Sequence, residues 1–458
     1  MVESARSNSP DGLSSVDLTE AVQLEAVGGD VRELQRKLWV AAKRSPGRRF
    51  HALFDRICRS DVLREAWVRV QRNKGAAGVD EQTVAAVREY GVERLLGELQ
   101  RDLRAGSYRP QPVRRVEIPK PQGGKRPLGI PTVRDRICQQ AARLVLEPIF
   151  EADFLEVSYG FRPRRKATDA KEVLRRSFID GYQFVFEADI RNYFSEIDHE
   201  RLLGMVAERV SDRRVLKLVR GWLHAGVMAD GMLRRTIAGT PQGGVISPLL
   251  SNIYLQALDE AFADGAHGRL VRYADDFVVI CRSEAEARAA QQLAGEVLAG
   301  VGLELHPEKT KVVDLREGRE GFDFLGCHFR ARVSGRMLER GVRRYYLQRW
   351  PSQRAMTRVR GKIKAKTGKG RAGQDIREVI ADLNPVVRGW GNYFRTGNAA
   401  KKFNQIDYYV VGRLRGLMVK RYGRNLKAGQ TSNWTREFFE DHGLYRLRGT
   451  VRYPGYAS

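Results

Sequence analysis

Cysteine is scarce in this sequence, and its few copies are far apart. The chain has four, Cys58, Cys138, Cys281 and Cys327, and no C-x-x-C pair among them. This spacing argues against a disulfide framework and against a zinc ribbon. The seven histidines are scattered as well, so neither residue type indicates a structural metal.

Long apolar stretches are also absent. No run of about 18 apolar residues, the length of a membrane span, occurs in the chain. The first residues, MVESARSNSPDGLSSVD, lack the apolar segment of a signal peptide. We therefore expect no membrane partner and a reducing, cytoplasmic location.

Acidic residues are few relative to basic ones. The 458 residues include 81 Lys and Arg against 55 Asp and Glu, a formal net charge of +26, while the apolar content is ordinary at 42%. Residues 331–458 hold 29 basic and 8 acidic residues, so most of the excess lies there. The charge predicts a polyanionic partner, usually nucleic acid, and the alternative is a basic solubilising surface. The length allows two or three domains.

Two adjacent aspartates stand out in RLVRYADDFVVICRS, residues 269–283. Asp275 and Asp276 lie between the apolar runs 270–274 and 277–281, which predicts a tight β-hairpin with both acids at its tip. Adjacent like charges repel each other, and a divalent cation removes this cost. A lone Asp-Asp pair is more often only a solvated turn, so the interpretation needs a second acidic element.

The second acidic element is YQFVFEADIRNYFSEIDH, residues 182–199. It predicts a strand over 184–190 with Asp189 near its end, and Asp198 and Glu187 are possible rivals. Because Glu187 shares a strand face with Asp189, alternation alone does not decide between these two. If this strand lies beside the hairpin, three carboxylates meet at one sheet edge. Such a set can hold two Mg²⁺ ions about 3.5–4 Å apart for phosphoryl transfer.

The sequence between these acidic elements is a Gly/Pro loop that leads into a helix, AGTPQGGVISPLLSNIYLQALDEAF (238–262). Gly239, Gly243 and Gly244 allow a backbone to approach a ligand closely, and Gln242 is a candidate polar contact.

Other segments predict helices and loops. Residues 31–72 show helical spacing, and a helix is expected over 135–150. NKGAAGVDEQT predicts a loop before a helix with Asp80 near its cap. The stretch GKIKAKTGKGRAG, 361–373, predicts a flexible basic loop.

Together these segments resemble those of a reverse transcriptase. The Y-A-D-D of residues 273–276 matches the family's Y-x-D-D hairpin, ADIRNYF its first aspartate motif, and TPQGGVISPLLSN its P-Q-G block. GKRPLGIPTVRDRICQ, HPEKTKVVD and FDFLGCHF match a finger block and two later palm blocks. All six occur in the family's order. The resemblance implies a mixed α/β (α+β) right-hand polymerase with fingers, a palm and an α-helical thumb.

Within that family the chain resembles the group II intron-encoded enzymes with maturase activity. NKGAAGVD is similar to their extra N-terminal block, and LNPVVRGWGNYFRTG and FNQIDYYVVGRLRGLMVKRYG are similar to their maturase, or thumb, domain. The implied organisation is an extension (a loose tail or an added helix), then fingers, then a palm with residues 201–240 contributing to the fingers, and then a basic thumb/maturase domain with a short tail. The respective ranges are 1–45, 46–182, 183–333 and 334–458.

The resemblance also implies a set of site residues. Asp189, Asp275 and Asp276 would bind two Mg²⁺ ions, helped by the carbonyl of Ile190. A bulky ring at Phe194 would exclude a 2′-hydroxyl group and select dNTPs.

Further side chains would contact the incoming nucleotide, and either of two lysines would protonate the pyrophosphate. The nucleotide contacts are Lys120, Arg126 and Gln242, and the two lysines are Lys309 and Lys311.

Basic residues near the C-terminal end are candidates for RNA binding. Five of them accompany a helical apolar pattern in 403–424 and two lie in the basic stretch 361–373, and such Lys and Arg side chains can bind phosphates in a salt-dependent way. Trp390, Tyr393 and Phe394 would either stack on bases or, as their spacing favours, pack in a core. The RNA-binding candidates are Lys362, Lys364, Arg413, Arg415, Lys420, Arg421 and Arg424.

The implied partners are group II intron RNA, target DNA and dNTPs, in a protein associated with ribonucleoprotein as a monomer or a dimer. After residue 424 only His442 and no cysteine follow, so the chain resembles the nuclease-lacking members. The alternatives are the reverse transcriptase of a retron, a diversity-generating element or a defence system, and a splicing cofactor without polymerase activity.

Overall fold

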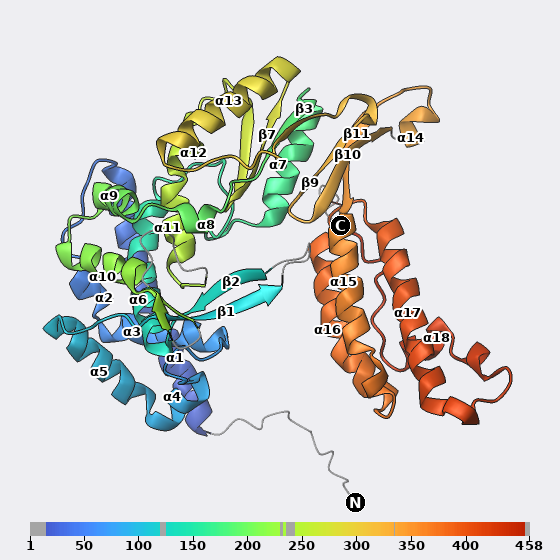
Figure 1. The fold of residues 1–458 in the computed structure, drawn as a ribbon, viewed down its shortest axis with the longest axis horizontal. Helices are drawn as coiled ribbons and strands as arrows, with labels where there is room; N and C mark the ends of the chain where they lie inside the picture. The colour runs from blue at the N-terminus through green and yellow to red at the C-terminus, as the bar shows by residue number, and fades with distance from the viewer. Residues whose placement is uncertain (1–14, 120–124, 230–231, 235–242, 334, 454–458) are drawn as a thin grey trace, which may run out of the picture.

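A computed structural model of the chain describes residues 15–119, 125–229, 232–234, 243–333 and 335–453. The fold is mixed α/β. Figure 1 shows N-terminal helices and a small sheet on one side, a second sheet in the middle, and a group of long helices on the other side. Among the described residues, none of the helices combines the length and the apolar character of a membrane span.

Helix α6 is the centre of the N-terminal helical region. Fifteen of its side chains are buried, and α1, α2, α3 and α5 pack against it. The expected helix over 135–150 is confirmed. Asp80 lies near the start of α4, as expected, and accepts from the Gln82 amide. The N-cap itself is Thr83, whose side chain accepts from the Ala86 amide. The helices of this region are α1 (Ser15–Arg44), α2 (Phe54–Ile57), α3 (Ser60–Arg72), α4 (Val84–Tyr90), α5 (Val92–Ala105) and α6 (Val133–Glu151).

A four-stranded sheet lies beside these helices in the order β2-β1-β4-β5. β1 and β2 form an antiparallel hairpin, and β1 pairs with β4 in parallel. Figure 1 shows the hairpin extending toward the C-terminal helices. The strands are β1 (Val113–Pro119), β2 (Lys125–Ile130), β4 (Val227–Ala229) and β5 (Met232–Arg234), and the neighbouring helices are α9 (His199–Arg209) and α10 (Arg213–His224).

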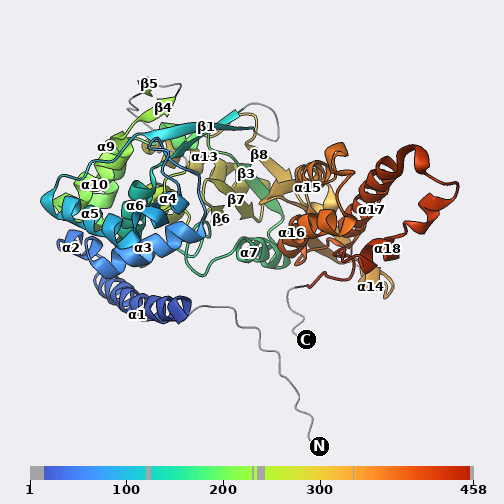
Figure 2. The ribbon, with the colours of Figure 1, turned by 90° about the horizontal axis from the view of Figure 1, so that it is seen from below.

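The central sheet has the order β6-β7-β3-β8 and is antiparallel throughout. Its strands alternate between two hydrophobic cores, so that Phe186 belongs to one core and Val185 to the other. Helix α13 covers one face and α7 the other, as Figure 2 shows. The elements are α7 (Ala167–Ile179), β3 (Phe184–Ala188), β6 (Arg269–Tyr273), β7 (Asp276–Cys281), α13 (Glu284–Gly300) and β8 (Lys311–Asp314).

Short helices connect these layers. Tyr193 lies at the start of α8 and Ser247 at the start of α11, which is buried along most of its length. The connecting elements are α8 (Tyr193–Glu196), α11 (Ser247–Tyr254), α12 (Gln256–Ala261), η1 (Arg316–Gly318) and α14 (Gly335–Leu338).

A third sheet, β11-β10-β9, joins the central sheet to the C-terminal helices. β11 pairs with β10, and the first of the long C-terminal helices begins after it, at Gln353. The prediction of a flexible loop over 361–373 was wrong for its first half, since α15 continues to Lys366. The elements are β9 (Gly321–Phe324), β10 (Cys327–Val333), β11 (Tyr345–Pro351), α15 (Gln353–Lys366), η2 (Lys369–Arg371), α16 (Ile376–Phe394), α17 (Ala400–Tyr422), η3 (Gly423–Asn425), η4 (Gln430–Asn433) and α18 (Arg436–Asp441).

Candidate active site

The two adjacent aspartates lie at the two-residue loop of a β-hairpin. Tyr273 of β6 pairs with Asp276 of β7, which leaves Ala274 and Asp275 as the turn residues. Ala274 has a φ of 58°, a left-handed conformation that costs free energy for a residue with a side chain and is often retained at functional sites. The predicted hairpin is therefore confirmed, but only Asp275 lies in its turn, because Asp276 is already the first residue of β7.

Asp189 follows the last residue of β3, next to this hairpin. Ala188 pairs with Phe277 in the antiparallel β3–β7 ladder, so the register brings Asp189 opposite Asp276. The backbone of Asp189 is held in place, because its carbonyl accepts from the His306 amide at 2.7 Å. The two acidic segments are thus neighbours, which is the condition that the sequence argument left open.

The rival acids have different positions. Glu187 lies on β3 beside β8, and its carboxylate forms an ion pair with Lys311 at 3.3 Å. Burial raises the pKa of Glu187 above its usual value. Asp198 instead caps helix α9 by accepting from the Arg201 amide at 2.7 Å. A structural role therefore accounts for Asp198, while Glu187 shares a cavity with Asp189.

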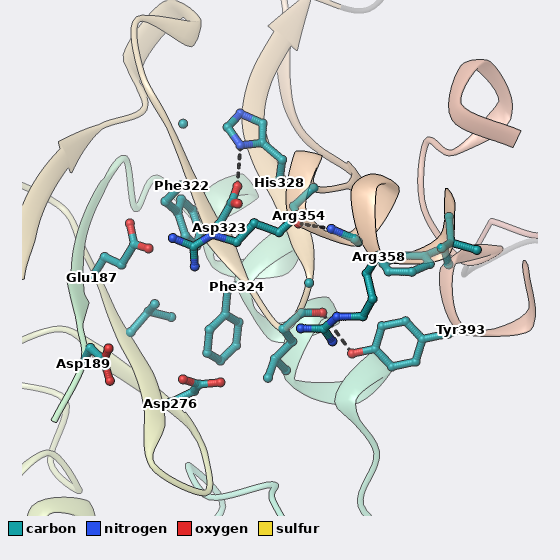
Figure 3. A pocket seen from close by; sticks show the side chains of 18 of the residues that line it. Glu187, Asp189, Asp276, Phe322, Asp323, Phe324, His328, Arg354, Arg358 and Tyr393 are labelled. Carbon is teal, nitrogen blue, oxygen red and sulfur yellow. Dashed lines mark hydrogen bonds and ion pairs between the residues drawn. The ribbon is translucent and has the colours of Figure 1, made fainter. Parts of the chain in front are cut away.

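That cavity has a volume of about 1150 Å³ and separates the central sheet from the C-terminal helices. Its sheet side carries Asp189 and Asp276, which Figure 3 shows at one end of the cavity. Its helix side carries Arg354, Arg358 and Lys362, all exposed on α15. One wall can therefore attract cations and the other can attract phosphate groups.

The two candidate lysines have separate partners. The ammonium group of Lys309 lies 2.6 Å from an Asp189 carboxylate oxygen, and Lys311 binds Glu187. Lys309 thus contacts Asp189, the predicted catalytic carboxylate. Lys311 lies opposite Glu187 in the β3–β8 ladder, further from the hairpin turn. This geometry favours Lys309 over Lys311 as the group nearer to a bound nucleotide.

The donor atoms at Asp189 and Asp276 fit a hard divalent cation, because carboxylate oxygens are its preferred ligands. The Lys309 ammonium group, itself a cation, already forms an ion pair with the Asp189 carboxylate. In the described part of the chain, no group of three or more His, Cys, Asp or Glu side chains is gathered closely enough to hold a metal ion. A metal ion would thus compete with Lys309 for Asp189.

Phe194, the predicted gate, lies on α8 and is half-buried. Its ring packs edge-on against Tyr193 with a centroid distance of 5.0 Å, and the Tyr193 hydroxyl donates to the Ser251 carbonyl at 2.9 Å. Ile190 follows the strand end and forms an isolated bridge with Leu305.

The other predicted nucleotide contacts are described only in part. Lys120 and Gln242 lie outside the described residues, and Arg126 lies on β2 opposite Ile118 with its side chain outside them. At Gly243 an added Cβ atom would lie 2.5 Å from the Gly129 carbonyl oxygen, so Gly243 packs closely on the backbone of β2.

The predicted RNA-binding residues divide into two groups. Lys362 and Lys364 are exposed on α15, and Lys420 is exposed on α17. The Arg424 side chain lies outside the described part of the chain.

Three arginines of α17 contact their own helical region. Arg413 donates to the Thr367 side chain and carbonyl, Arg415 to a carbonyl at 2.6 Å and Arg421 to a carbonyl at 3.3 Å. Their guanidinium groups therefore contribute to the packing of the helices, which the sequence did not indicate.

The aromatic residues of α16 line the same cavity. Phe394 is 6% exposed and belongs to the core, as its spacing predicted. Tyr393 is 40% exposed, and its hydroxyl donates to the Leu325 carbonyl at 2.9 Å. The sequence interpretation missed Arg354 and Arg358, although the i, i+4, i+8 spacing of residues 354, 358 and 362 predicts one basic helix face.

Comparison with known proteins assigns these regions to families. The family described as "Reverse transcriptase (RNA-dependent DNA polymerase)" matches residues 118–329, and "Group II intron, maturase-specific domain" matches residues 356–435. Polymerases of this family typically use divalent metal ions.

Individual relatives agree with this assignment. "Protein YkfC" of Escherichia coli (strain K12) is 37% identical over 339 residues, which cover 65% of this chain and 87% of that protein. "Group II intron-encoded protein LtrA" of Lactococcus lactis subsp. cremoris is 38% identical over 214 residues, covering 46% of this chain and 35% of that protein. Among solved structures, a chain of a "Partial Cas6-RT-Cas1--Cas2 complex" has 25% identity and a TM-score of 0.34 over 54% of this chain and 41% of that chain, too low to support an argument.

Proposed function

This chain belongs to the group II intron reverse transcriptase/maturase family, and from that membership and the geometry of the cavity we propose that it copies RNA into DNA and assists the splicing and retrohoming of a group II intron. The observation that carries the proposal is the cavity with Asp189 and Asp276 on one wall and the cations of α15 on the other. Primer-extending polymerases need both features, a carboxylate site for cations and a phosphate-binding surface.

The proposed organisation is a right hand. The N-terminal helices and the β2-β1-β4-β5 sheet would be the fingers, the central sheet the palm, and α15 to α18 the thumb. The cavity between the central sheet and α15 would then hold the primer–template duplex at its 3′ end. The boundaries we propose for these parts stay at 46–182, 183–333 and 334–458, and the sheet region continues into the last of them as far as Pro351 of β11.

The proposed catalytic residues are Asp189, Asp275 and Asp276, with the carbonyl of Ile190 as a further ligand. Two Mg²⁺ ions held there would activate the primer hydroxyl group and stabilise charge on the leaving pyrophosphate. Lys309 would move from Asp189 to the pyrophosphate oxygens, and Phe194 would meet the 2′ position of the sugar. Lys120, Arg126 and Gln242 remain proposed contacts of the incoming nucleotide.

The maturase-specific domain implies binding of intron RNA. We place this contact on the exposed lysines of α15 and α17, Lys362, Lys364 and Lys420. Splicing assistance would depend on RNA binding alone, whereas retrohoming would also need DNA synthesis at a target DNA site. The two roles are therefore expected to separate by mutation.

The test compares the wild-type protein with Asp275→Ala/Asp276→Ala and with Asp55→Asn as a control. Asp55 is a surface acid, 70% exposed, that forms an ion pair with Arg214, and such pairs contribute little. DNA synthesis is measured on poly(rA)–oligo(dT) with dTTP and Mg²⁺. Binding is measured with RNA transcribed from the DNA that flanks the coding sequence.

We expect extension by the wild type and the control, none by the double mutant, and equal RNA binding by all three proteins. Absence of extension by the wild type would contradict the polymerase assignment. Loss of RNA binding in the double mutant would show that the two roles share one site.

A further inference from the structure

A buried network lies directly beneath the turn that carries the two aspartates. Arg272 of β6 is fully buried and forms a bidentate ion pair with Asp259 of α12, in which neither side chain is exposed. The same guanidinium group donates to the side-chain oxygen of Asn252 and to the carbonyl of Ala274, each at 3.0 Å. Arg272 thus contacts the turn itself, one residue before Asp275.

Asn252 extends the network to a second backbone segment, which contains Gly160. Its amide group donates to the Gly160 carbonyl at 2.9 Å. Gly160 packs so tightly on the turn that an added Cβ atom would lie 2.2 Å from the Ala274 nitrogen. The segment before Gly160 also pairs with β6, because the Tyr159 amide donates to the Arg272 carbonyl at 2.8 Å. The turn is therefore held between Arg272 on one side and Gly160 on the other.

Helix α11 connects this network to the proposed nucleotide pocket. Ser251, the residue before Asn252, accepts from the Tyr193 hydroxyl through its carbonyl and donates its own hydroxyl to the Tyr193 oxygen at 3.0 Å. Tyr193 in turn packs against Phe194. Of two consecutive residues of this buried helix, Asn252 thus binds Arg272, which holds the turn, and Ser251 binds the segment that carries the gate.

Stability alone is a poor reason to retain such a network. A buried ion pair often contributes no more free energy than apolar residues of the same volume, because desolvation of both charges is costly. Here two additional bonds of the guanidinium group go to the turn and to the residue that holds Gly160. Ala274, which accepts one of them, has the left-handed φ of 58°, a conformation that surrounding contacts must maintain.

We propose that Asn252, Arg272 and Asp259 form a buried clamp that fixes the Ala274–Asp275 turn relative to α11, and so sets the position of Asp275 and Asp276 against the nucleotide pocket. These three are positioning residues, since none of them lines the cavity. The inference rests on the proposed polymerase function. A carboxylate misplaced by about 1 Å can lower a rate by about 100-fold, so loosening the clamp reduces turnover more than stability.

The test uses two variants. Asn252→Ala leaves the Arg272–Asp259 ion pair intact, and Arg272→Lys keeps the positive charge but loses the several N–H donors of the guanidinium group. Asn384→Ala is the matched control, because Asn384 also bridges two backbone groups, the Gly443 carbonyl and the Tyr445 amide. Extension of oligo(dT) on poly(rA) is measured against Mg²⁺ and dTTP concentration, and the folded fraction is measured by thermal unfolding.

Both clamp variants are expected to remain folded, to lose about 10- to 100-fold in kcat, and to need more Mg²⁺ for half-maximal rate. Asn384→Ala is expected to lower the melting temperature without changing the Mg²⁺ requirement. Unchanged kcat and Mg²⁺ dependence in Asn252→Ala would overturn the proposal, and so would loss of folding in both clamp variants, because the network would then act on stability. Failure of the wild type to extend the primer would instead overturn the polymerase assignment.

Discussion

Replacement of Gly160 by alanine tests the packing around the catalytic turn with a single added carbon atom. The new Cβ atom would lie 2.2 Å from the Ala274 nitrogen and 2.8 Å from the Tyr273 carbonyl carbon. Both are backbone atoms, so no side-chain rotation relieves the contact. The turn or the Gly160 segment has to move on the order of 1 Å to restore ordinary contact distances in a close-packed interior.

A shift of this size has two expected consequences. Overpacking of a well-packed site typically costs about 1–3 kcal/mol, which leaves most of the protein folded. Misplacement of the adjacent carboxylates by about 1 Å lowers kcat by about 100-fold. The variant is therefore expected to lose activity far beyond its loss of folded protein.

The assay is steady-state primer extension on an RNA template, with thermal unfolding of the same samples. Gly204→Ala is the control, because Gly204 lies in helix α9 with no atom within 4 Å of an added Cβ atom. That change is expected to keep full activity and to stabilise the helix by about 0.5–1 kcal/mol. Full activity and unchanged stability in Gly160→Ala would refute the argument that the turn is sterically held.

Three further predictions concern nucleotide selection, duplex binding and acid stability. Phe194→Val is expected to improve incorporation of ribonucleotides relative to deoxyribonucleotides by about 10- to 200-fold, measured as a ratio of kcat/KM, and an unchanged ratio would remove the ring from the gate. Combined Arg354→Gln, Arg358→Gln and Lys362→Gln is expected to weaken primer–template binding and to reduce the slope of log affinity against log salt by about 2 to 3; an unchanged slope would separate α15 from the duplex. Neighbouring guanidinium groups lower the pKa of Asp314 from 3.8 to about 2, so its contribution to stability is complete above the unfolded value and is lost as the pH falls through that range. The melting temperature of Asp314→Asn is accordingly expected to lie below that of the wild type near neutral pH and to converge with it toward pH 2, whereas a gap that widens in acid would contradict the assigned cause.

Local patterns in the sequence were sufficient to predict the acidic parts of the site. Short β-branched runs on both sides of Asp275 and Asp276 predict a hairpin, and the strand before Asp189 follows the same rule. Once β3 and β7 pair, the antiparallel register brings Asp189, at the end of β3, next to Asp276, at the start of β7. The basic face of α15 was also visible in principle, as charges repeated every four residues.

Other features depend on contacts between distant segments. Asp259 and Arg272 look like ordinary surface charges in the sequence, but α12 and β6 bring them together in a site closed to solvent. Arg413 has the same apparent exposure, yet it binds the end of α15 at Thr367. Residues 361–366 were misread as a loop because glycine and lysine dominate them, although lysine and alanine are good helix formers and apolar Ile363 is fully buried.

The role of Asp189 as a metal-binding carboxylate of the active site is tested by the rate of a single dTTP addition to oligo(dT) on poly(rA), measured for the wild-type protein and for Asp189→Asn. Asp189 lies next to the hairpin, lines the cavity and forms an ion pair with Lys309. Its replacement by asparagine removes one charge with almost no change in side-chain volume. We expect Mg²⁺-dependent addition by the wild type, a rate at least about 100-fold lower in Asp189→Asn, and unchanged RNA binding by both proteins. Equal rates in the two proteins would contradict the assignment of this carboxylate, and with it the location of the active site.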